Sequence, residues 1–444
     1  MRQAPVHPIS TRRMIFSALV VSLFAFGVQS QVQSTNPMTQ GMKEVPSHRR
    51  AFVVRHARIF DGKQVIAADS VFAQDGKIQS VGKNLKVPPG TDEIDGPGDT
   101  LLPGLIDSHT HDWGQALLFG VTTELNMAGN PKYVAELKQA EAEGKGLDSA
   151  DMLSAGDVVT PPKGHGTEYG VPAPTLASAA EVQQFVDERI AEGSDYIKII
   201  LEDGHLCHIT FSKLSSEELT AVVAAAHKRG KMAIAHISSQ DDAREAIVAG
   251  ADGIAHLFAD SARQPDFAEF MRAHHAFVIT TLTAIQSSLG SPNGASLLAD
   301  NRVAGFLSGD AQSRLKAPMP FTCSGKLDNA FAAAKQLHDA GVPVLAGTDA
   351  PAPGSSNGVS MHGELQLLVR AGLTPSGALA AATSVPAAMF HLKDRGRIAA
   401  GLRADLLLVR GDPTEDITAT RDIAAVWKAG IQVDRGPHPA DPAK

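Results

Sequence analysis

Eight apolar, strand-like runs alternate with stretches of helical periodicity over residues 102–394 of this chain. Most of the helical stretches close on a glycine, the residue that helix ends favour. Strands separated by helices form parallel sheets, so the count of eight predicts an α/β protein built on a (β/α)8 TIM barrel. A doubly wound open sheet has the same local pattern and remains the alternative. The eight runs are GLIDSHTH, GVTTELNM, ADMLSAGDVV, DYIKIIL, KMAIAHI, GIAHLF, FVITTLTA and VPVLAGTDA.

The two ends of the chain share a sequence pattern that is typical of β-strands and differs from that of residues 102–394. Short alternating runs with Asp-Gly turns fill residues 51–101, and similar runs return at residues 395–437. We therefore expect both ends to build one small composite β-sandwich beside the barrel domain of residues 102–394. Residues 31–50 are polar, contain proline and lack any pattern, which predicts a linker.

The first thirty residues have the layout of a secretory signal peptide. Arg12 and Arg13 precede an apolar stretch from Met14 to about Val28, and small residues follow it. The arginine pair also resembles a twin-arginine signal, and an uncleaved N-terminal anchor is the alternative. We expect an exported protein, periplasmic or secreted, that does not enter the membrane once residues 1–30 are removed.

Charge and cysteine content narrow the classes of function. Loss of residues 1–30 removes three arginines and takes the formal net charge from −8 to −11, which disfavours nucleic acid and anionic membranes as partners. Cys207 and Cys323 are the only cysteines, so the chain has no CxxC metal motif and no disulfide framework. They either pair in an oxidising compartment or stay as free buried thiols.

Polar side chains end several of the apolar runs, where a core alone would call for another valine or alanine. His109 and His111 lie two residues apart, so on a strand both point the same way and can reach one metal ion. His236, His256 and Asp349 end later runs. Strand ends meet at one face of a barrel, so these residues predict a metal site rather than separate core or surface histidines. Imidazole and carboxylate ligands suit zinc, and also manganese, iron or cobalt.

Lys198 lies between apolar neighbours in the run DYIKIIL. A buried, isolated ammonium is unfavourable, so this lysine loses its proton or finds an anion. One interpretation pairs it with a carboxylate such as Asp349 or lets its amine reach the rim. The other is that the neutral amine takes up CO₂ as a carbamate, whose negative charge can bridge two metal ions about 3.5–4 Å apart.

The motif PGLIDSHTH after a β-rich lead, Lys198 in the fourth run, GTDA and the closing GRIAAGLRADLLLV resemble the metal-dependent amidohydrolase superfamily over about residues 51–437. The segments IKI and GHG are most similar to its branch of prolidases and imidazolonepropionase-like proteins. The resemblance implies a barrel with a composite sandwich and two divalent metal ions, with zinc expected. It implies one metal on His109, His111 and Asp349, the other on His236 and His256, and carbamylated Lys198 as the bridge.

Two segments depart from that branch. Strand five commonly continues His-Ala-His-Gly in the branch but reads HISS here, and LEDGHLCH follows strand four where a glycine pair is expected. Both lie where substrate would bind, so the resemblance does not carry the substrate over. Mononuclear deaminases of the superfamily have a glutamate three residues after the strand-five histidine. Ser239 stands at that position, which argues against deamination.

The predicted function is hydrolysis of an amide C–N bond in a peptide-like, N-acyl amino acid or cyclic amide substrate, as a dipeptidase or carboxypeptidase would perform. Two metal ions would lower the pKa of a bridging water and make hydroxide available. Asp349 would take up its proton as general base and return it to the departing amine as general acid. An esterase or lactonase with the same centre, or a metal-binding scaffold without turnover, are the alternatives. Retention of Lys198 in a buried strand argues against the scaffold.

Three further histidines are predicted to contact substrate. His165 in GHG and His205 in LEDGHLCH fall on loops after the third and fourth runs, and His362 in SMHGEL follows the eighth. Solvated loop histidines are the alternative for the first two, and a helix cap is the alternative for His362. The expected partner is a small molecule, with a homo-oligomer left open.

Overall fold

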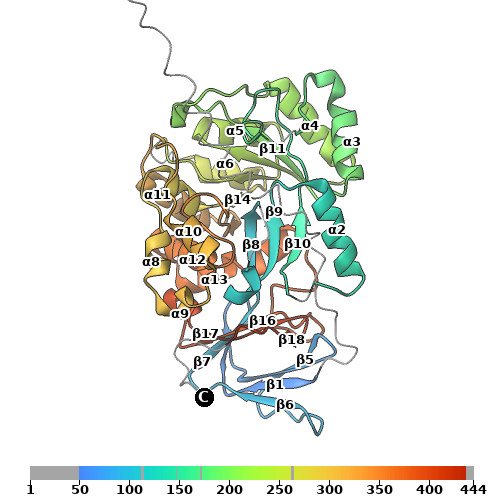
Figure 1. Ribbon diagram of the computed structural model, residues 1–444, viewed down its shortest axis with the longest axis vertical. Coiled ribbons are helices and arrows are strands. Elements are labelled where there is room, and N and C mark those ends of the chain that lie inside the picture. Colours follow the sequence, from blue (N-terminus) through green and yellow to red (C-terminus); the bar gives the residue numbers. More distant parts are fainter. Residues whose placement is uncertain (1–49, 112–114, 147, 171–172, 262–264, 437–444) are drawn as a thin grey trace, which may run out of the picture.

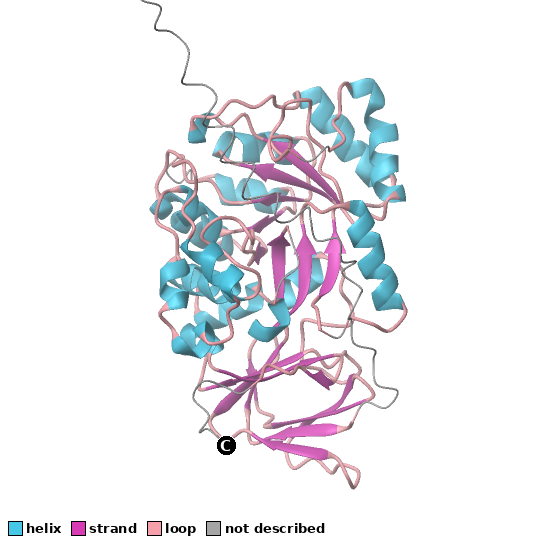
Figure 2. Cartoon of the chain, viewed as in Figure 1, coloured by secondary structure: helices cyan, strands magenta, loops and turns pink. Residues whose placement is uncertain are grey.

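The computed structural model describes residues 50–111, 115–146, 148–170, 173–261 and 265–436. The predicted signal segment lies outside them, as does nearly all of the predicted linker. A small domain made only of strands lies at one end, and a larger domain of strands and helices lies above it (Figures 1 and 2). None of the helices among the described residues has the length and apolar character that crossing a membrane would require.

Strands from both ends of the chain build the small domain. One sheet has the order β5-β4-β1-β6, and the other has the order β18-β17-β16-β7-β2-β3. In the second sheet β16, near the C-terminus, pairs antiparallel with β7, which precedes the larger domain. Phe52 stacks on Trp427 between the sheets with ring centroids 5.0 Å apart. The strands are β1 (Phe52–Arg55), β2 (Arg58–Phe60), β3 (Val65–Ile66), β4 (Ser70–Gln74), β5 (Lys77–Gly82), β6 (Asp92–Asp95), β7 (Asp99–Pro103), β16 (Leu406–Arg410), β17 (Ile423–Lys428) and β18 (Ile431–Gln432).

The larger domain contains all eight predicted strands. They form two parallel sheets, of order β10-β9-β8 and β11-β12-β13-β14-β15. Backbone hydrogen bonds connect the edges of the two sheets: Val159 N donates to Lys198 O at 2.8 Å, and His111 N donates to Ala350 O at 2.8 Å. The strands are β8 (Leu105–Thr110), β9 (Val121–Asn126), β10 (Asp151–Ser154), β11 (Ile197–Leu201), β12 (Ala233–Ile237), β13 (Gly253–Ala255), β14 (Phe277–Ile279) and β15 (Val344–Leu345).

Helices cover the outside of these sheets (Figure 1). Helix α4 shows how local sequence sets a boundary, because Ser215 and Glu218 form a capping box at its start. The α-helices are α2 (Pro131–Ala142), α3 (Val182–Ala191), α4 (Ser216–Lys228), α5 (Gln240–Val248), α6 (Phe267–Ala273), α7 (Leu282–Ser288), α8 (Gly294–Leu298), α9 (Asn301–Ala304), α10 (Gly309–Lys316), α11 (Leu327–Asp339), α12 (Val359–Arg370), α13 (Pro375–Ala381) and α14 (Ser384–Met389). Short 3-10 turns are η1 (Ala116–Phe119), η2 (Ala179–Glu181), η3 (His205–Cys207) and η4 (Ile417–Arg421).

The seventh predicted run, FVITTLTA, changes structure halfway. Its strand β14 ends at Ile279, and helix α7 begins at Leu282. The buried carboxylate of Glu364, on α12, accepts hydrogen bonds from Leu282 N at 3.0 Å and Thr283 N at 2.8 Å. An anion at a helix start satisfies its free amide groups and its dipole. A distant side chain therefore decides where this apolar run turns into a helix.

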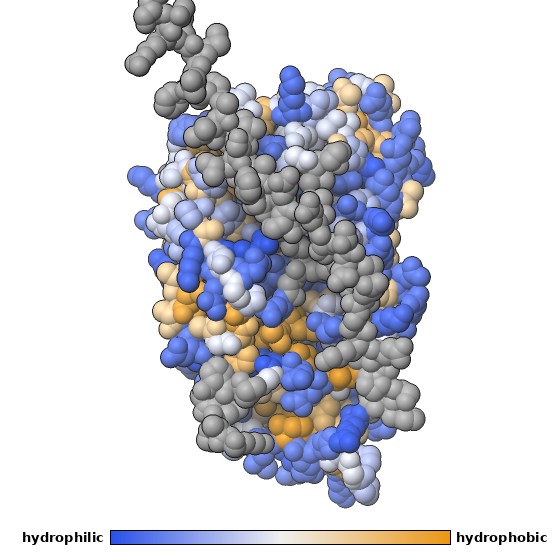
Figure 3. Space-filling view, in the orientation of Figure 1, coloured by the Kyte–Doolittle hydropathy of each residue, from blue (hydrophilic) through white to orange (hydrophobic). Residues whose placement is uncertain are grey.

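Cys207 and Cys323 form a disulfide across a sequence separation of 116 residues. The bond joins η3, after β11, to the segment before α11, and Ser324 N donates to Leu206 O at 2.7 Å beside it. The alternative of free thiols is therefore excluded. Elsewhere the surface of the helical layer is mainly hydrophilic, and apolar residues gather toward the sandwich in the view of Figure 3.

A buried charge network joins the two domains at Asp151, the first residue of β10. Its carboxylate lies 2.6 Å from Arg395 Nη1 and 2.7 Å from Lys428 Nζ, and it also contacts Arg403. Burial would raise the pKa of Asp151, but these three cations outweigh burial and hold that pKa well below its usual value. The ionised carboxylate thus binds three cations of the C-terminal segment to the larger domain.

We expect Asp151→Ala to lower the free energy of unfolding by about 3–5 kcal/mol, because loss of one partner leaves buried charges uncompensated. Denaturant unfolding measures this loss. Asp394→Ala is the matched control, since Asp394 pairs with the same Arg395 but its side chain is 53% exposed. The control should lose less than about 1 kcal/mol. Equal losses from both variants would contradict the assignment.

Glu141 of α2 adds a pH dependence to this junction. Burial, and then the charge of Asp151, raise the pKa of Glu141 to about 7 from its ordinary 4.5. A raised carboxyl pKa means that the folded state holds the proton more tightly than the unfolded state does. The resulting stability is complete below pH 4.5 and is lost as the pH rises through 7.

We expect Glu141→Gln to raise the free energy of unfolding by about 1–3 kcal/mol at pH 8, with the gain vanishing near pH 4. The amide keeps an oxygen for Met152 N, which donates to Glu141 Oε1 at 3.3 Å. Thermal unfolding across this pH range measures the effect. Glu143→Gln serves as control, because Glu143 is exposed and pairs with Lys145. A pH-independent gain in Glu141→Gln would refute the raised pKa.

Candidate metal centre

The carboxyl ends of β8 and β15 are clamped together by a buried aspartate. Asp107 accepts hydrogen bonds from Thr348 Oγ1 at 2.7 Å, Thr348 N at 3.0 Å and His109 N at 3.1 Å. Asp349 N in turn donates to His109 O at 2.8 Å. These bonds bring the HTH segment of one strand end against the GTDA segment of the other. They position His109, His111 and Asp349 side by side.

The first group of ligand atoms forms around Asp349. Its Oδ1 lies 2.8 Å from His111 Nε2 and 3.2 Å from His109 Nε2, and the two nitrogens are 3.2 Å apart. The ring of His256 lies 4.6 Å from that of His109. His109, His256 and Asp349 each present one ligand atom, and these atoms lie within 4.8 Å of one another. Two imidazoles with a carboxylate make a donor set suited to zinc, manganese or iron.

The second group forms around His236, at the end of β12. Its Nε2 lies 2.6 Å from Glu202 Oε2, and its ring lies 5.0 Å from the ring of His165. His165, Glu202 and His236 also present ligand atoms within 4.8 Å of one another. The His165 Nδ1 atom is bonded to Glu168 Oε1 at 2.6 Å. Burial would lower the pKa of His165, but Glu168 outweighs burial and raises it.

His256 belongs to the first group and also lies against His236 of the second. Its ring lies 4.6 Å from that of His109 and 4.5 Å from that of His236. Thr281 Oγ1 lies 2.7 Å from His256 Nδ1. The other ring nitrogen, Nε2, is therefore the one available as a metal ligand between His109 and His236. His256, Thr281 and Asp349 all have positive φ, at 74°, 42° and 59°. Such backbone conformations are uncommon outside glycine and gather at functional sites.

Lys198 of β11 belongs to the same cluster. Its Nζ is buried and has no hydrogen-bond partner among the described residues. Its charge acts on His109, His236 and His256, which places it among the ligand groups. Burial lowers the pKa of Lys198 to about 7, against the opposing charge of Asp349. A large fraction of this amine is therefore neutral near pH 7.

The protonation states of the cluster match what a divalent cation needs. Burial lowers the pKa of His109, His236 and His256, so these imidazoles are neutral at pH 7. Burial would raise the pKa of Asp349, but its bonds to His109 and His111 hold it well below the usual value. Neutral imidazoles and an ionised carboxylate are the forms that bind metals. The unpartnered amine and the converging nitrogens thus fit a metal centre.

Two predicted substrate residues lie apart from this cluster. His205, on η3, is 57% exposed and is bonded to Asp203. His362 is buried on α12, where its Nδ1 lies 3.0 Å from Thr420 Oγ1 and its Nε2 lies 3.1 Å from Phe119 O. Both of its ring nitrogens are occupied by these contacts, which give no support to the predicted contact of His362 with substrate. His165, by contrast, lies beside His236.

Two carboxylates of the site were missed from the sequence. Glu202 is buried directly after the apolar strand β11, and a polar residue at a strand end is the same signal that identified His236 near the end of β12. Glu168 follows His165 by three residues and bonds to it. A search for carboxylates at strand ends, and not for histidines alone, would have found Glu202. The sequence carries no comparable signal for Glu168.

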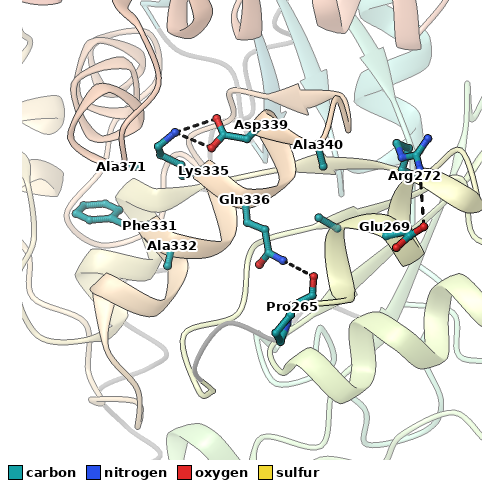
Figure 4. Close-up of a pocket in the computed structure, with 11 residues that line it drawn as sticks. Pro265, Glu269, Arg272, Phe331, Ala332, Lys335, Gln336, Asp339, Ala340 and Ala371 are labelled. Carbon is teal, nitrogen blue, oxygen red and sulfur yellow. Dashed lines mark hydrogen bonds and ion pairs between the residues drawn. The ribbon is translucent and has the colours of Figure 1, made fainter.

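A separate pocket of about 770 Å³ lies away from this chemistry, between α6 and α11. Figure 4 shows its polar lining already paired: Gln336 bonds to Pro265 O, and Lys335 bonds to Asp339. None of its lining residues belongs to either ligand group. The pocket does not extend the metal centre.

The sequence pattern of the amidohydrolase family matches residues 100–433. An ochratoxinase from Aspergillus niger is 26% identical over 397 residues, covering 76% of this chain and 76% of its own. An imidazolonepropionase from Deinococcus radiodurans is 27% identical over 401 residues, covering 83% of this chain and 93% of its own.

Solved structures show the same fold. A protein assigned as a prolidase from Bifidobacterium longum superposes with a TM-score of 0.70 at 26% identity, covering 87% of this chain and 95% of that one. The A. niger ochratoxinase structure superposes with a TM-score of 0.67 at 21% identity, covering 88% and 97%. The likeness extends over nearly the whole described chain.

Proposed function

The chain belongs to the amidohydrolase family, an enzyme family of hydrolases, and from this premise we propose that it is a binuclear metal-dependent hydrolase. It cleaves an amide C–N bond in a small peptide-like, N-acyl amino acid or cyclic amide substrate. One observation carries the proposal: an unpartnered buried amine lies among converging neutral imidazoles and an ionised carboxylate. That arrangement is unfavourable without a cation to bind.

Barrel architecture is part of the proposal. The two parallel sheets are taken as two arcs of one closed (β/α)8 barrel. Isolated parallel bridges support this closure, because Val159 pairs with Ile199 at one junction and Thr110 pairs with Ala350 at the other. In such barrels the catalytic residues lie at the carboxyl ends of the strands, where this cluster is found.

Lys198 completes the ligand set as a carbamate. Its neutral amine forms an N–C bond with CO₂ and releases one proton, which turns a buried neutral amine into an anion. The carbamate, His109, His111 and Asp349 would hold one ion, and the carbamate, His236 and His256 the other. When bound, two divalent cations, with zinc expected, polarise a carbonyl and lower the pKa of a shared water.

Asp349 moves the proton in this proposal. Its Oδ1 faces His109 and His111, which leaves Oδ2 to accept the proton of the attacking water. The same atom then donates that proton to the departing amine nitrogen. His165, whose Nδ1 is hydrogen-bonded to Glu168, offers the N–H of its other ring nitrogen to an anionic or carbonyl group of the substrate.

Export is the remaining part of the proposal. The disulfide between Cys207 and Cys323 supports it, because such bonds persist in oxidising compartments such as the periplasm. The predicted signal layout of residues 1–30 supports the same location.

Metal analysis together with a substrate panel tests the function. Purified protein should bind two divalent ions per chain and hydrolyse at least one N-acyl amino acid, dipeptide or cyclic amide. Chelation should abolish turnover, and zinc should restore it. Lactones and carboxylic esters in the same panel separate amide hydrolysis from ester hydrolysis. Activity that survives complete metal removal, or turnover of the esters alone, would overturn the proposal.

A further inference from the structure

Glu202 is placed against His236 by strand register. In the parallel pair of β11 and β12, Ile200 lies opposite His236. Glu202 is two residues farther along, on the same side of its strand as Ile200, and its side chain is buried. The carboxylate therefore reaches the neighbouring imidazole from the end of β11.

The contact selects one tautomer of His236. Oε2 of Glu202 lies 2.6 Å from Nε2 of His236. An ionised carboxylate only accepts hydrogen bonds, so Nε2 must carry the hydrogen and donate it. The lone pair of this neutral imidazole is then on Nδ1. While this hydrogen bond is present, the other neutral tautomer of the ring is excluded.

In His256 the other ring nitrogen, Nδ1, is the one that is hydrogen-bonded. Its Nδ1 is bonded to Thr281 Oγ1 at 2.7 Å, which leaves Nε2 for the space between the rings. The two rings lie 4.5 Å apart and nearly perpendicular, at 76°. Each imidazole therefore has one nitrogen held by a neighbouring side chain and the other nitrogen available.

We propose that Glu202 is a positioning residue that directs Nδ1 of His236 toward the second metal ion. This inference rests on the proposed binuclear function. Carboxylates behind metal-bound histidines fix the tautomer and raise ligand basicity. Glu202 stands in the LEDG segment, where the family resemblance leads to a glycine pair instead. The carboxylate is thus a feature of this chain's own centre.

Zinc titration of metal-free full-length protein tests the role of Glu202. Glu202→Ala should weaken one of two zinc sites by about 10–100-fold and leave the other within about threefold. Glu202→Gln should recover most of the affinity, because its side-chain oxygen still accepts the Nε2 hydrogen. Asp203→Asn is the matched control, since Asp203 lies on the same loop but bonds to His205. It should leave both sites unchanged.

The unfolding temperature of each metal-free variant shows whether the change is confined to metal binding. A zinc-loaded crystal structure should place zinc on Nδ1 of His236 and on Nε2 of His256. Unchanged zinc affinity in Glu202→Ala, zinc on Nε2 of His236, or zinc on Glu202 itself would overturn the inference. Wild-type protein decides the proposed function separately: fewer than two zinc ions per chain would defeat that function, and this inference with it.

Discussion

Asp349→Asn is expected to lower kcat by about 10²–10⁴-fold while the protein stays folded. Asparagine keeps a side-chain oxygen for the contacts of Oδ1 with His109 and His111. It also tolerates the positive φ of 59° at this position better than most residues do. What it cannot do is accept the proton of the attacking water.

Steady-state kinetics with metal analysis on the same sample checks this expectation. The metal content should stay near that of the wild type, so that the loss of turnover reports proton transfer and not an empty site. Asp203→Asn, an exposed aspartate after β11, is the control for a charge change near the centre. A fully active Asp349→Asn protein would remove Asp349 from the mechanism.

Lys198→Met is expected to move activity and stability in opposite directions. Methionine fills the volume of the lysine stem but can form no carbamate, so one metal ion and turnover should be lost, the latter by more than about 10³-fold. Metal-free protein should become more stable by about 1–4 kcal/mol at pH 7, because burial lowers the pKa of Lys198 to about 7.

The lowered pKa of Lys198 also predicts how the stability gained by Lys198→Met depends on pH. A lysine whose pKa falls on folding binds its proton more weakly in the folded state than in the unfolded state. The penalty is therefore absent above pH 10.5, grows as the pH falls toward 7 and is constant below. The stability gained by Lys198→Met should shrink accordingly between pH 7 and pH 10.

Lys428→Met is the matched control for the stability measurement. Lys428 is also buried, but its Nζ is paired with Asp151 at 2.7 Å and bonded to Gly146 O at 2.7 Å. Removing a satisfied cation should destabilise the protein, and removing the unsatisfied one should stabilise it. If both variants lose stability, Lys198 is not an unsatisfied cation.

Rescue separates the carbamate from the lysine itself. In Lys198→Ala protein, a short carboxylate such as propionate can enter the space left by the side chain and supply the missing anion. Added propionate should therefore recover part of the metal binding and turnover. Recovery by methylamine instead would show that the site needs the amine and not a carbamate.

Much of the site could be predicted from local sequence. The apolar runs end in His109, His236, His256 and Asp349, and each of these departs from what a core alone requires. Lys198 departs further from what a core requires, because it is a charged residue type inside an apolar run. Because parallel strands end at one edge, residue type and position in the run are enough to predict that these side chains meet.

The features that could not be predicted from local sequence depend on contacts between residues that are far apart in the chain. The run FVITTLTA turns into a helix because Glu364, 84 residues after Thr280, binds the start of α7. His362 follows the eighth strand, yet the direction of α12 turns it toward Thr420 and Phe119. Neither outcome has a local signature, since each depends on how separate elements pack.

Chain order and residue chemistry therefore establish which groups gather, because they depend on periodicity and on the polarity of strand ends. The tautomer, the position and the covalent pairing of these groups are not determined in that way. Glu202 selects the tautomer of His236, Asp107 clamps two strand ends, and the pairing of Cys207 with Cys323 joins loops 116 residues apart. These features depend on distances across the fold, which no local stretch of residues encodes.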